Sequence, residues 1–206
     1  MNFTCYYHRF SNLIVESNPE FTSDFNEITS ALNLITDVDL IAHFNDRKIS
    51  RLNTKSLSES INRILKAHLC KKGWAAESPI FREAPYDATN NKAWRLDFAK
   101  NNISIEVAFN HGEAIAHNIM KPVLASELNH VKKNIQTRLG VIITCTEEFK
   151  KKGGFDGAVG TYEKFISYLK PYNNLVTTPI VLIGLQPTST FEIKNKEIIY
   201  YKDCLF

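Results

Sequence analysis

Two short apolar runs, at residues 140–145 and 179–185, constrain the fold of this chain more than any other feature of its sequence. Each run has the length and composition of a strand that is covered on both faces of a sheet. Between the runs, four side chains recur at helical spacing and form one face: Tyr162, Phe165, Ile166 and Leu169. A strand, a helix and a strand in this order predict a crossover between parallel strands. We therefore predict an α/β fold with a mixed central β-sheet that helices flank.

The N-terminal part of the chain predicts one strand and two helices. Residues 2–7 have the composition of a strand. Ser23 can cap a helix that runs to about Leu34, and Asp37 can cap a short helix after it, because short polar side chains bind the free backbone N–H groups of a first turn. These elements are expected to cover part of the sheet.

Two further helices are predicted in the middle of the chain. The first covers residues 57–71, and Ser56 before it and Glu59 three residues later have the spacing of a capping box. The second covers residues 112–128, where Pro122 is expected to kink or split the helix because proline lacks the backbone N–H.

Length and composition bound the class of protein. A chain of 206 residues can bury an α/β core without disulfides. No repeat or low-complexity linker interrupts it, so we predict a single domain over residues 1–206, in which residues 1–55 pack on a core at 56–185. The formal charge of +3 permits a nucleic-acid partner without demanding one.

The cysteines and the apolar segments favour a soluble protein of the cytoplasm. The four cysteines stand far apart, with no C-x-x-C pair to hold zinc: Cys5, Cys70, Cys145 and Cys204. A reducing compartment fits this use of cysteine. The sequence shows no signal peptide and no run of about 18 apolar residues, so no membrane partner is expected.

The centre of the chain predicts a β-hairpin with one acid on each arm. Residues 94–99 and 103–109 have strand character, and residues 100–102 supply the turn. The acids are Asp97 and Glu106, and Glu106 stands among β-branched and aromatic neighbours, where an ionised side chain is costly unless it is paired or binds a cation. Two carboxylates that meet at one point could hold a hard divalent ion.

A structural role is the alternative for these two acids. Both could lie at strand ends and form ion pairs with Arg95 or with a lysine. The spacing of the acids alone leaves both interpretations open.

This centre resembles the core of the PD-(D/E)XK nucleases, and its Asp-x8-Glu-Val-x-Phe form is similar to that of the BglII/BstYI restriction endonucleases. The residues that carry the resemblance are Leu96, Asp97, Ile105, Glu106, Val107 and Phe109. Three later segments follow in the order of that family: residues 140–143, 157–164 and 179–184. The resemblance spans about residues 66–185. It implies a restriction-endonuclease-like fold, Mg²⁺ as cofactor, and a metal held by the side chains of Asp97 and Glu106 and by the carbonyl of Val107.

One position departs from the pattern of that family. Its members usually have a polar residue two positions after the glutamate, whereas this chain has Ala108, which can neither orient a water nor stabilise charge. Candidates for the missing catalytic group are Asn110, His111 and Lys100, although His111 could equally be an ordinary residue at the start of a helix. Related enzymes draw an outer carboxylate from the region before the hairpin, where this chain has Glu77 and Glu83.

Three short clusters of lysine are candidates for contacts with phosphate: residues 71–72, 132–133 and 150–152. We select Lys150, Lys151 and Lys152 as DNA-binding residues, because the glycine-rich residues 152–157 after them predict a flexible loop that faces DNA. That segment lacks the order of a nucleotide-binding loop. Solvated helix ends are the structural alternative for all three clusters.

The sequence therefore predicts a Mg²⁺-dependent type II restriction endonuclease, a homodimer that cuts double-stranded DNA at a short palindrome. A cognate DNA methyltransferase encoded nearby in a prokaryotic genome is the expected companion. The first alternative is a DNA-binding or interaction module with a decayed nuclease core, which Ala108 motivates. The second is a repair or phage-exclusion nuclease without a strict sequence preference.

Overall fold

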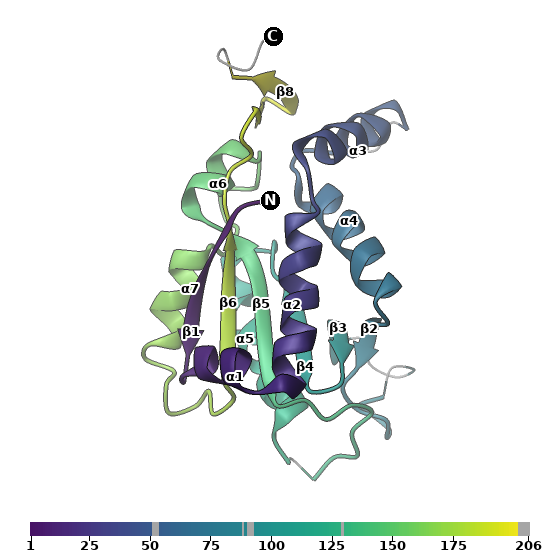
Figure 1. Cartoon of the computed structure of the whole chain (residues 1–206), viewed down its shortest axis with the longest axis vertical. Helices are drawn as coiled ribbons and strands as arrows, with labels where there is room; N and C mark the ends of the chain where they lie inside the picture. The colour runs from purple at the N-terminus through teal and green to yellow at the C-terminus, as the bar shows by residue number, and fades with distance from the viewer. Residues whose placement is uncertain (51–53, 88, 90–92, 129, 202–206) are drawn as a thin grey trace.

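A six-stranded mixed β-sheet organises the chain, in the strand order β1-β6-β5-β4-β3-β2 (Figure 1). The computed structural model describes residues 1–50, 54–87, 89, 93–128 and 130–201. The six strands are β1 Phe3–His8, β2 Ala75–Pro79, β3 Arg95–Lys100, β4 Ile103–Val107, β5 Leu139–Cys145 and β6 Ile180–Leu185. A separate two-stranded sheet follows, made of β7 Phe191–Lys194 and β8 Glu197–Tyr200. The fold class predicted from the sequence is confirmed.

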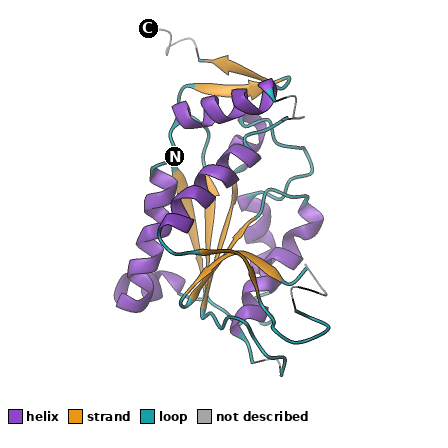
Figure 2. Ribbon diagram, turned by 90° about the vertical axis from the view of Figure 1, so that its right-hand side faces the viewer, coloured by secondary structure: helices purple, strands orange, loops and turns teal. Residues whose placement is uncertain are grey.

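Helices cover both faces of the large sheet, as Figure 2 shows. They are α1 Ser11–Ser17, α2 Pro19–Asn33, α3 Asp37–Ile49, α4 Ser58–Lys71, α5 Ile115–Ser126, α6 Glu147–Lys152 and α7 Tyr162–Leu169. A 3-10 turn, η1 Gly112–Ala114, leads into α5. Apolar side chains of α2 and α4 pack on one face of the sheet with Val141 and Ile143, and those of α5 and α7 pack on the other face with Ile142.

The predicted crossover is present. Strands β5 and β6 pair in parallel and all their residues are buried, as expected for strands covered on both faces. Strand β4 also pairs with β5 in parallel, whereas β1 is antiparallel to β6, and β2, β3 and β4 form an antiparallel meander. The C-terminal ends of β4, β5 and β6 therefore meet at one edge of the sheet.

The starts of two N-terminal helices differ from the prediction. Helix α2 begins at Pro19, four residues before Ser23, because the side chain of Asn18 accepts a hydrogen bond from the backbone N–H of Glu20 and proline suits a first turn. Helix α3 is capped by Thr36 instead of Asp37. Thr36 and Asp39 exchange side-chain and backbone hydrogen bonds in a capping box.

The capping box predicted at Ser56 is wrong. The side-chain oxygen of Ser56 pairs with the hydroxyl of Ser58 and accepts a hydrogen bond of 3.4 Å from the backbone N–H of the same residue, and the residue at the N-cap position is Leu57, which supplies no side-chain cap. Glu59 forms an ion pair with Arg47 of α3 instead of reaching back to the chain before the helix. Leu57 is fully buried, so the entry of the chain into α4 is held by apolar packing.

Helix α5 is continuous through Pro122, so the predicted split does not occur. Pro122 is buried against β5, where a β-carbon at Gly140 would lie 2.6 Å from Cβ of Pro122. The absent side chain of Gly140 therefore lets α5 come close to the sheet.

Three of the cysteines, Cys5, Cys70 and Cys145, are free thiols, and Cys204 lies outside the described residues. None of the helices in the described part of the chain combines the length and apolarity that a membrane span needs. The core joins side chains of α1, α2 and α3 to those of the sheet. The single-domain organisation itself stays a prediction.

Candidate active site

The hairpin of β3 and β4 brings Asp97 and Glu106 together. Phe98 pairs with Ile105 in this hairpin, so the next pair along the ladder sets Asp97 opposite Glu106. The Oδ2 atom of Asp97 accepts a hydrogen bond of 2.6 Å from the backbone N–H of Val107. The three residues that the sequence selected as metal ligands are therefore adjacent in the fold.

Glu106 is almost completely buried, with 2% of its surface exposed. Its Oε2 atom accepts a hydrogen bond of 2.7 Å from Nζ of Lys121 in α5. Its Oε1 atom is buried without a hydrogen-bond partner among the described residues. Burial, and then the charge of Asp97, raise the pKa of Glu106 to about 8. The alternative that one acid pairs with a lysine is thus realised, and it involves a lysine that sequence reasoning did not single out.

Asp97 is one of the residues that line an open hollow of about 340 Å³. Burial is the main cause that raises its pKa, and the nearby charge of Glu77 acts in the same direction. Helix α4 forms the basic wall of this hollow with Asn62, Arg63 and Lys66, which follow one another at helical spacing. The wall faces a carboxylate, so the hollow offers both a cation site and donors for an anion.

Glu77 is another acid of the hollow, which Glu59 also lines. It stands across from Asp97 in the β2–β3 ladder, between the pairs that Ala76 and Ser78 form, and it lines the same hollow. Its backbone has a φ of 53°, a left-handed conformation that is unfavourable for a residue with a side chain. Strain of this kind is often found at functional sites. Glu83, which the structure also describes, is not among the residues that line the hollow.

Arg63 is oriented by a buried histidine. The Nη1 atom of Arg63 lies 2.9 Å from Nε2 of His43, whose Nδ1 atom is 3.0 Å from the hydroxyl of Ser60. Burial, followed by the charge of Arg63, lowers the pKa of His43, which favours the neutral ring that can accept the hydrogen bond from arginine. The position of Arg63 in the basic wall is therefore set by hydrogen bonds inside the protein.

Ala108 brings only a methyl group to the face of the strand on which Glu106 lies. It is buried, its N–H donates to the carbonyl of Ile143 at 2.8 Å, and its carbonyl accepts from the hydroxyl of Thr144 at 2.9 Å. Its side chain belongs to the apolar cluster that includes Ile119 of α5. Ala108 therefore contributes no polar side chain here, unlike the residue that the family usually has at this position.

The proposed substitutes for that side chain lie elsewhere. Asn110 accepts a hydrogen bond of 2.9 Å from Asn118, and His111 is exposed at a separate hollow beside Lys164. Lys100 points its ammonium at Glu27, 2.7 Å away, and also pairs with Asp24 at 3.3 Å. None of these three candidates lines the hollow of Asp97 among the described residues.

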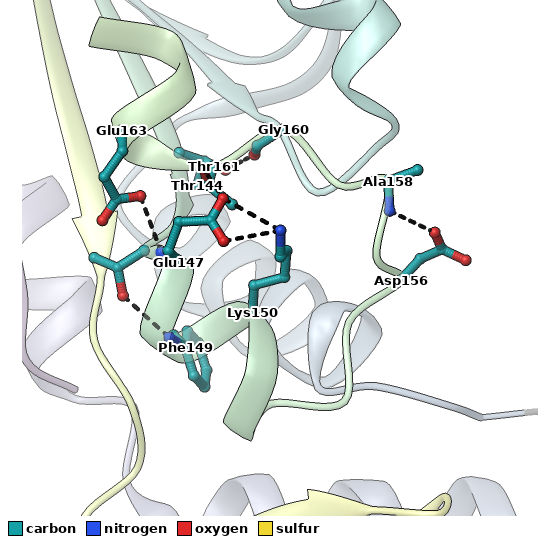
Figure 3. A network of polar contacts seen from close by, with 10 residues as sticks. Thr144, Glu147, Phe149, Lys150, Asp156, Ala158, Gly160, Thr161 and Glu163 are labelled. Atoms are coloured by element: carbon teal, nitrogen blue, oxygen red, sulfur yellow. Dashed lines mark hydrogen bonds and ion pairs between the residues drawn. The ribbon is translucent and has the colours of Figure 1, made fainter. Parts of the chain in front are cut away.

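The lysines at 150–152 belong to a helix instead of a loop. Lys150 is mostly buried and pairs with Glu147 at 2.9 Å, and Figure 3 shows this pair inside a network at the start of α7. Lys152 pairs with Glu148 at 2.8 Å, whereas Lys151 is exposed. The predicted flexible loop therefore begins only at Gly153, after α6 has ended. Contact of these lysines with DNA stays a prediction.

The two acids fit a metal ion only in combination with backbone groups. In the described part of the chain, no group of three or more His, Cys, Asp or Glu side chains is arranged to hold a metal. The half-buried Asp97 and the buried Glu106 nevertheless form an adjacent pair of carboxyl groups, and a cation would satisfy the Oε1 atom of Glu106, which has no hydrogen-bond partner among the described residues. Hard divalent ions accept such mixed sets of carboxylate, backbone carbonyl and water.

Comparison with solved structures places this arrangement in the class of restriction-endonuclease folds. A structure titled "Crystal structure of restriction endonuclease BGLII complexed with DNA 16-mer" is 20% identical, covers 93% of this chain and 80% of its own, and gives a TM-score of 0.66. "Crystal structure of free BglII" is 15% identical over 98% of this chain and all of that one, with a TM-score of 0.51. No curated protein sequence matches the chain.

The family follows from the sequence. The family model "Restriction endonuclease BglII/BglIII" matches residues 3–185, and the chain belongs to this family. It is therefore a type II site-specific deoxyribonuclease by family. The resemblance stated from the hairpin motif is confirmed.

Three functional candidates escaped sequence reasoning: Arg63, Lys66 and Lys121. The first two carried a readable signal, since Asn62, Arg63 and Lys66 share one face of a predicted helix. Lys121 carried none, because its contact with Glu106 depends on how α5 docks on the sheet.

Proposed function

We propose that this chain hydrolyses phosphodiester bonds of duplex DNA at a short palindromic site, with Mg²⁺ held by Asp97, Glu106 and the carbonyl of Val107. The observation that carries the proposal is the adjacent pair of the buried Glu106 and the half-buried Asp97, of which Asp97 lines a hollow with a basic wall. When bound, the metal would supply a Lewis acid that acidifies the attacking water and offsets charge on the phosphate.

The residues of the chain divide the remaining tasks. The N–H of Val107 holds Asp97 in place, so one carboxylate oxygen is fixed before any ligand binds. Arg63 and Lys66 lie where they can neutralise backbone phosphates beside the scissile bond. Asn110, His111 and the lysines at 150–152 remain candidates from the sequence. Of these lysines, Lys151 is exposed, whereas the other two would have to leave their glutamate partners to reach DNA.

The expected assembly is a homodimer, because a symmetric site is most simply read by a two-fold protein that cuts one strand with each subunit. The similar BglII structure with a DNA 16-mer supports duplex DNA as the substrate. A restriction enzyme of a prokaryotic cytoplasm also needs a methyltransferase that protects the host sites, and we expect its gene nearby.

The test is to incubate the purified protein with phage DNA and Mg²⁺ and to sequence the fragment ends. Discrete fragments with one repeated palindrome at their ends are expected, and chelation of the metal should prevent them. Asp97→Ala is the matched control and should leave the DNA intact. Heterogeneous ends would instead indicate a nuclease without strict sequence preference.

Ala108 favours one alternative, a module that binds DNA with a decayed nuclease core. Such a protein would shift duplex DNA in a gel but leave it uncut at any concentration of Mg²⁺ or Mn²⁺. Measuring binding and cleavage on the same samples separates the two functions.

A further inference from the structure

The alanine at position 108 leaves the carboxylate pair without the polar neighbour that the catalytic hairpin normally carries. Glu106 and Ala108 lie on the same face of the strand, since side chains alternate and two residues separate them. That face is covered by α5, whose Ile119 packs in the same cluster as Ala108. A replacement for the missing group must therefore come from α5 or from the substrate.

Helix α5 places one ionisable side chain at this point. Nζ of Lys121 lies 2.7 Å from Oε2 of Glu106, and the side chain of Lys121 is only 15% exposed. Burial raises the pKa of Asp97, and the charge of Lys121 acts on that pKa in the opposite direction. An ammonium of this kind on a buried carboxylate is costly to remove, because Glu106 would be left without its counter-charge.

The position of Lys121 is set by the fold of the helix and not by a flexible surface chain. Its neighbour Pro122 packs directly on Gly140 of β5, where a β-carbon would lie 2.6 Å from the proline. This close approach packs α5 directly against β5. Asn118 and Ile119, one turn before, are buried as well, so the segment that carries the lysine is well anchored.

We propose that Lys121 supplies from α5 the positively charged donor that position 108 lacks. It pairs with Glu106 before the metal binds, and with metal and DNA present its ammonium contributes charge and hydrogen bonds to the reacting phosphate. The inference rests on the proposed metal-dependent cleavage. An ammonium has three donors, and the bond to Glu106 uses one of them. In this role Lys121 acts as a positively charged hydrogen-bond donor.

The other candidates are less well placed than Lys121. Asn110 is held by Asn118, His111 lines another hollow, and Lys100 is committed to Glu27. Of the four side chains, Lys121 is the one that the described structure shows in contact with a carboxylate of the catalytic pair.

The experiment compares Lys121→Met, which keeps the length but not the charge, with Lys121→Arg, which keeps the charge. Lys164→Met is the matched control, because this lysine lies at the separate hollow of His111. Three quantities are measured for each: single-turnover cleavage with Mg²⁺, Mn²⁺ affinity without DNA by calorimetry, and the thermal unfolding midpoint without metal.

The expected result is that loss of the lysine slows cleavage but does not weaken metal binding. Lys121→Met should cut at least about 10²-fold more slowly, the scale of one lost electrostatic donor in a reaction. It should bind Mn²⁺ about threefold more tightly or better, because the competing charge beside Glu106 is gone. Lys121→Arg should regain most of the rate, and Lys164→Met should match the wild type in all three measurements.

Two results would overturn the inference. One is cleavage by Lys121→Met within about threefold of wild type, far below the loss of a reacting donor. The other is a parallel loss of cleavage, metal affinity and thermal stability, which is the signature of a merely structural lysine. Should Lys121→Met fail to fold, Lys121→Gln decides by the same criteria, since it keeps a donor to Glu106.

Failure of the proposed function would be recognised separately. In that case the wild type itself would not cut DNA, whatever happens at position 121. The effect of Lys121→Met on Mn²⁺ affinity would still be measurable, and unchanged or weaker binding would refute the part of the inference that concerns Glu106.

Discussion

Two clusters of acids and bases in this protein look alike in composition but differ in whether their polar groups find partners within the protein. Around Glu147 at the start of α6, Lys150 and the hydroxyl of Thr161 both donate to the carboxylate, as Figure 3 shows. Around Asp97, basic residues of α4 face an open hollow, and an oxygen of the neighbouring Glu106 has no partner among the described residues. The first cluster satisfies itself, whereas the second leaves room for a ligand.

The pKa shifts of the two acids differ in the same way. Hydrogen bonds from Lys150 and then Thr161 lower the pKa of Glu147, so its charge is stabilised by its own surroundings. Burial raises the pKa of Asp97, so its charge is disfavoured until a cation arrives. The comparison teaches that a functional cluster is recognised by what it leaves unsatisfied, not by the number of its charges.

The sharpest test of this comparison replaces each acid by its amide. Asp97→Asn should lower single-turnover cleavage at least about 10³-fold, because metal catalysis contributes several kcal/mol and each 1.36 kcal/mol is tenfold. Glu147→Gln should leave the rate within about threefold and cost about 1 kcal/mol of unfolding free energy in urea, the upper end of the range for ion pairs near the surface. Equal effects of both changes on cleavage would remove the distinction.

The second test concerns DNA affinity. Neutralising Arg63 and Lys66 together should weaken binding and flatten the salt dependence by about 0.9 log units for each lost phosphate contact. Changing Lys150, Lys151 and Lys152 to glutamine should have at most half that effect, because two of them are paired with glutamates. Binding is followed by fluorescence anisotropy in Ca²⁺ over a range of salt. An equal or larger change in the triple variant would return α6 to the DNA interface.

The third test uses the unusual backbone of Glu77. Glu77→Gln should cut about tenfold more slowly, the lower end of the effect of residues that support metal ligands. Glu77→Gly should lose the same activity yet gain about 1 kcal/mol of unfolding free energy, because glycine adopts the left-handed conformation without penalty. Glu83→Gln is the control and should change neither. A fully active Glu77→Gly would make this residue a matter of structure alone.

The smallest effect is expected at His43, which orients Arg63. The pKa of His43 is lowered from its ordinary 6.5, so the neutral ring belongs to the folded state. Its contribution to stability is complete above the ordinary pKa and is lost as the pH falls through the folded value. His43→Gln should therefore reduce, by about 1 kcal/mol or less, the loss of unfolding free energy between about pH 7.5 and pH 5. Identical pH profiles of the two proteins would contradict this role.

The fold could be predicted from the sequence where a buried element consists almost entirely of apolar residues. The runs that became β5 and β6 are buried along their whole length, so hydrophobicity alone located them. The start of α2 was missed although the pair Asn18-Pro19 carried the signal of a cap and a first turn. The capping box before α4 was misassigned because Glu59 pairs with Arg47 of α3, a tertiary partner that a local pattern cannot contain.

The site was predicted in part for the same reason. Asp97, Glu106 and Val107 are close along a hairpin, so their meeting followed from the turn. The lysine run at 150–152 attracted attention as a charge cluster, and its spacing to Glu147 and Glu148 could have warned that the charges are used internally. Lys121 lies 15 residues from Glu106 on another element, and only the docking of α5 brings them together.

The packing of Pro122 against Gly140 supplies a sequence pattern by which relatives of this chain can be found. A pattern that demands a polar residue two positions after the catalytic glutamate would discard this sequence. A pattern that accepts alanine there, but requires a Lys-Pro pair on the following helix and a glycine in the next strand, would retain it. If Lys121 takes over the task of the polar residue at position 108, family members should carry either that polar residue or the lysine on the following helix, but not both. An alignment could count how often that holds.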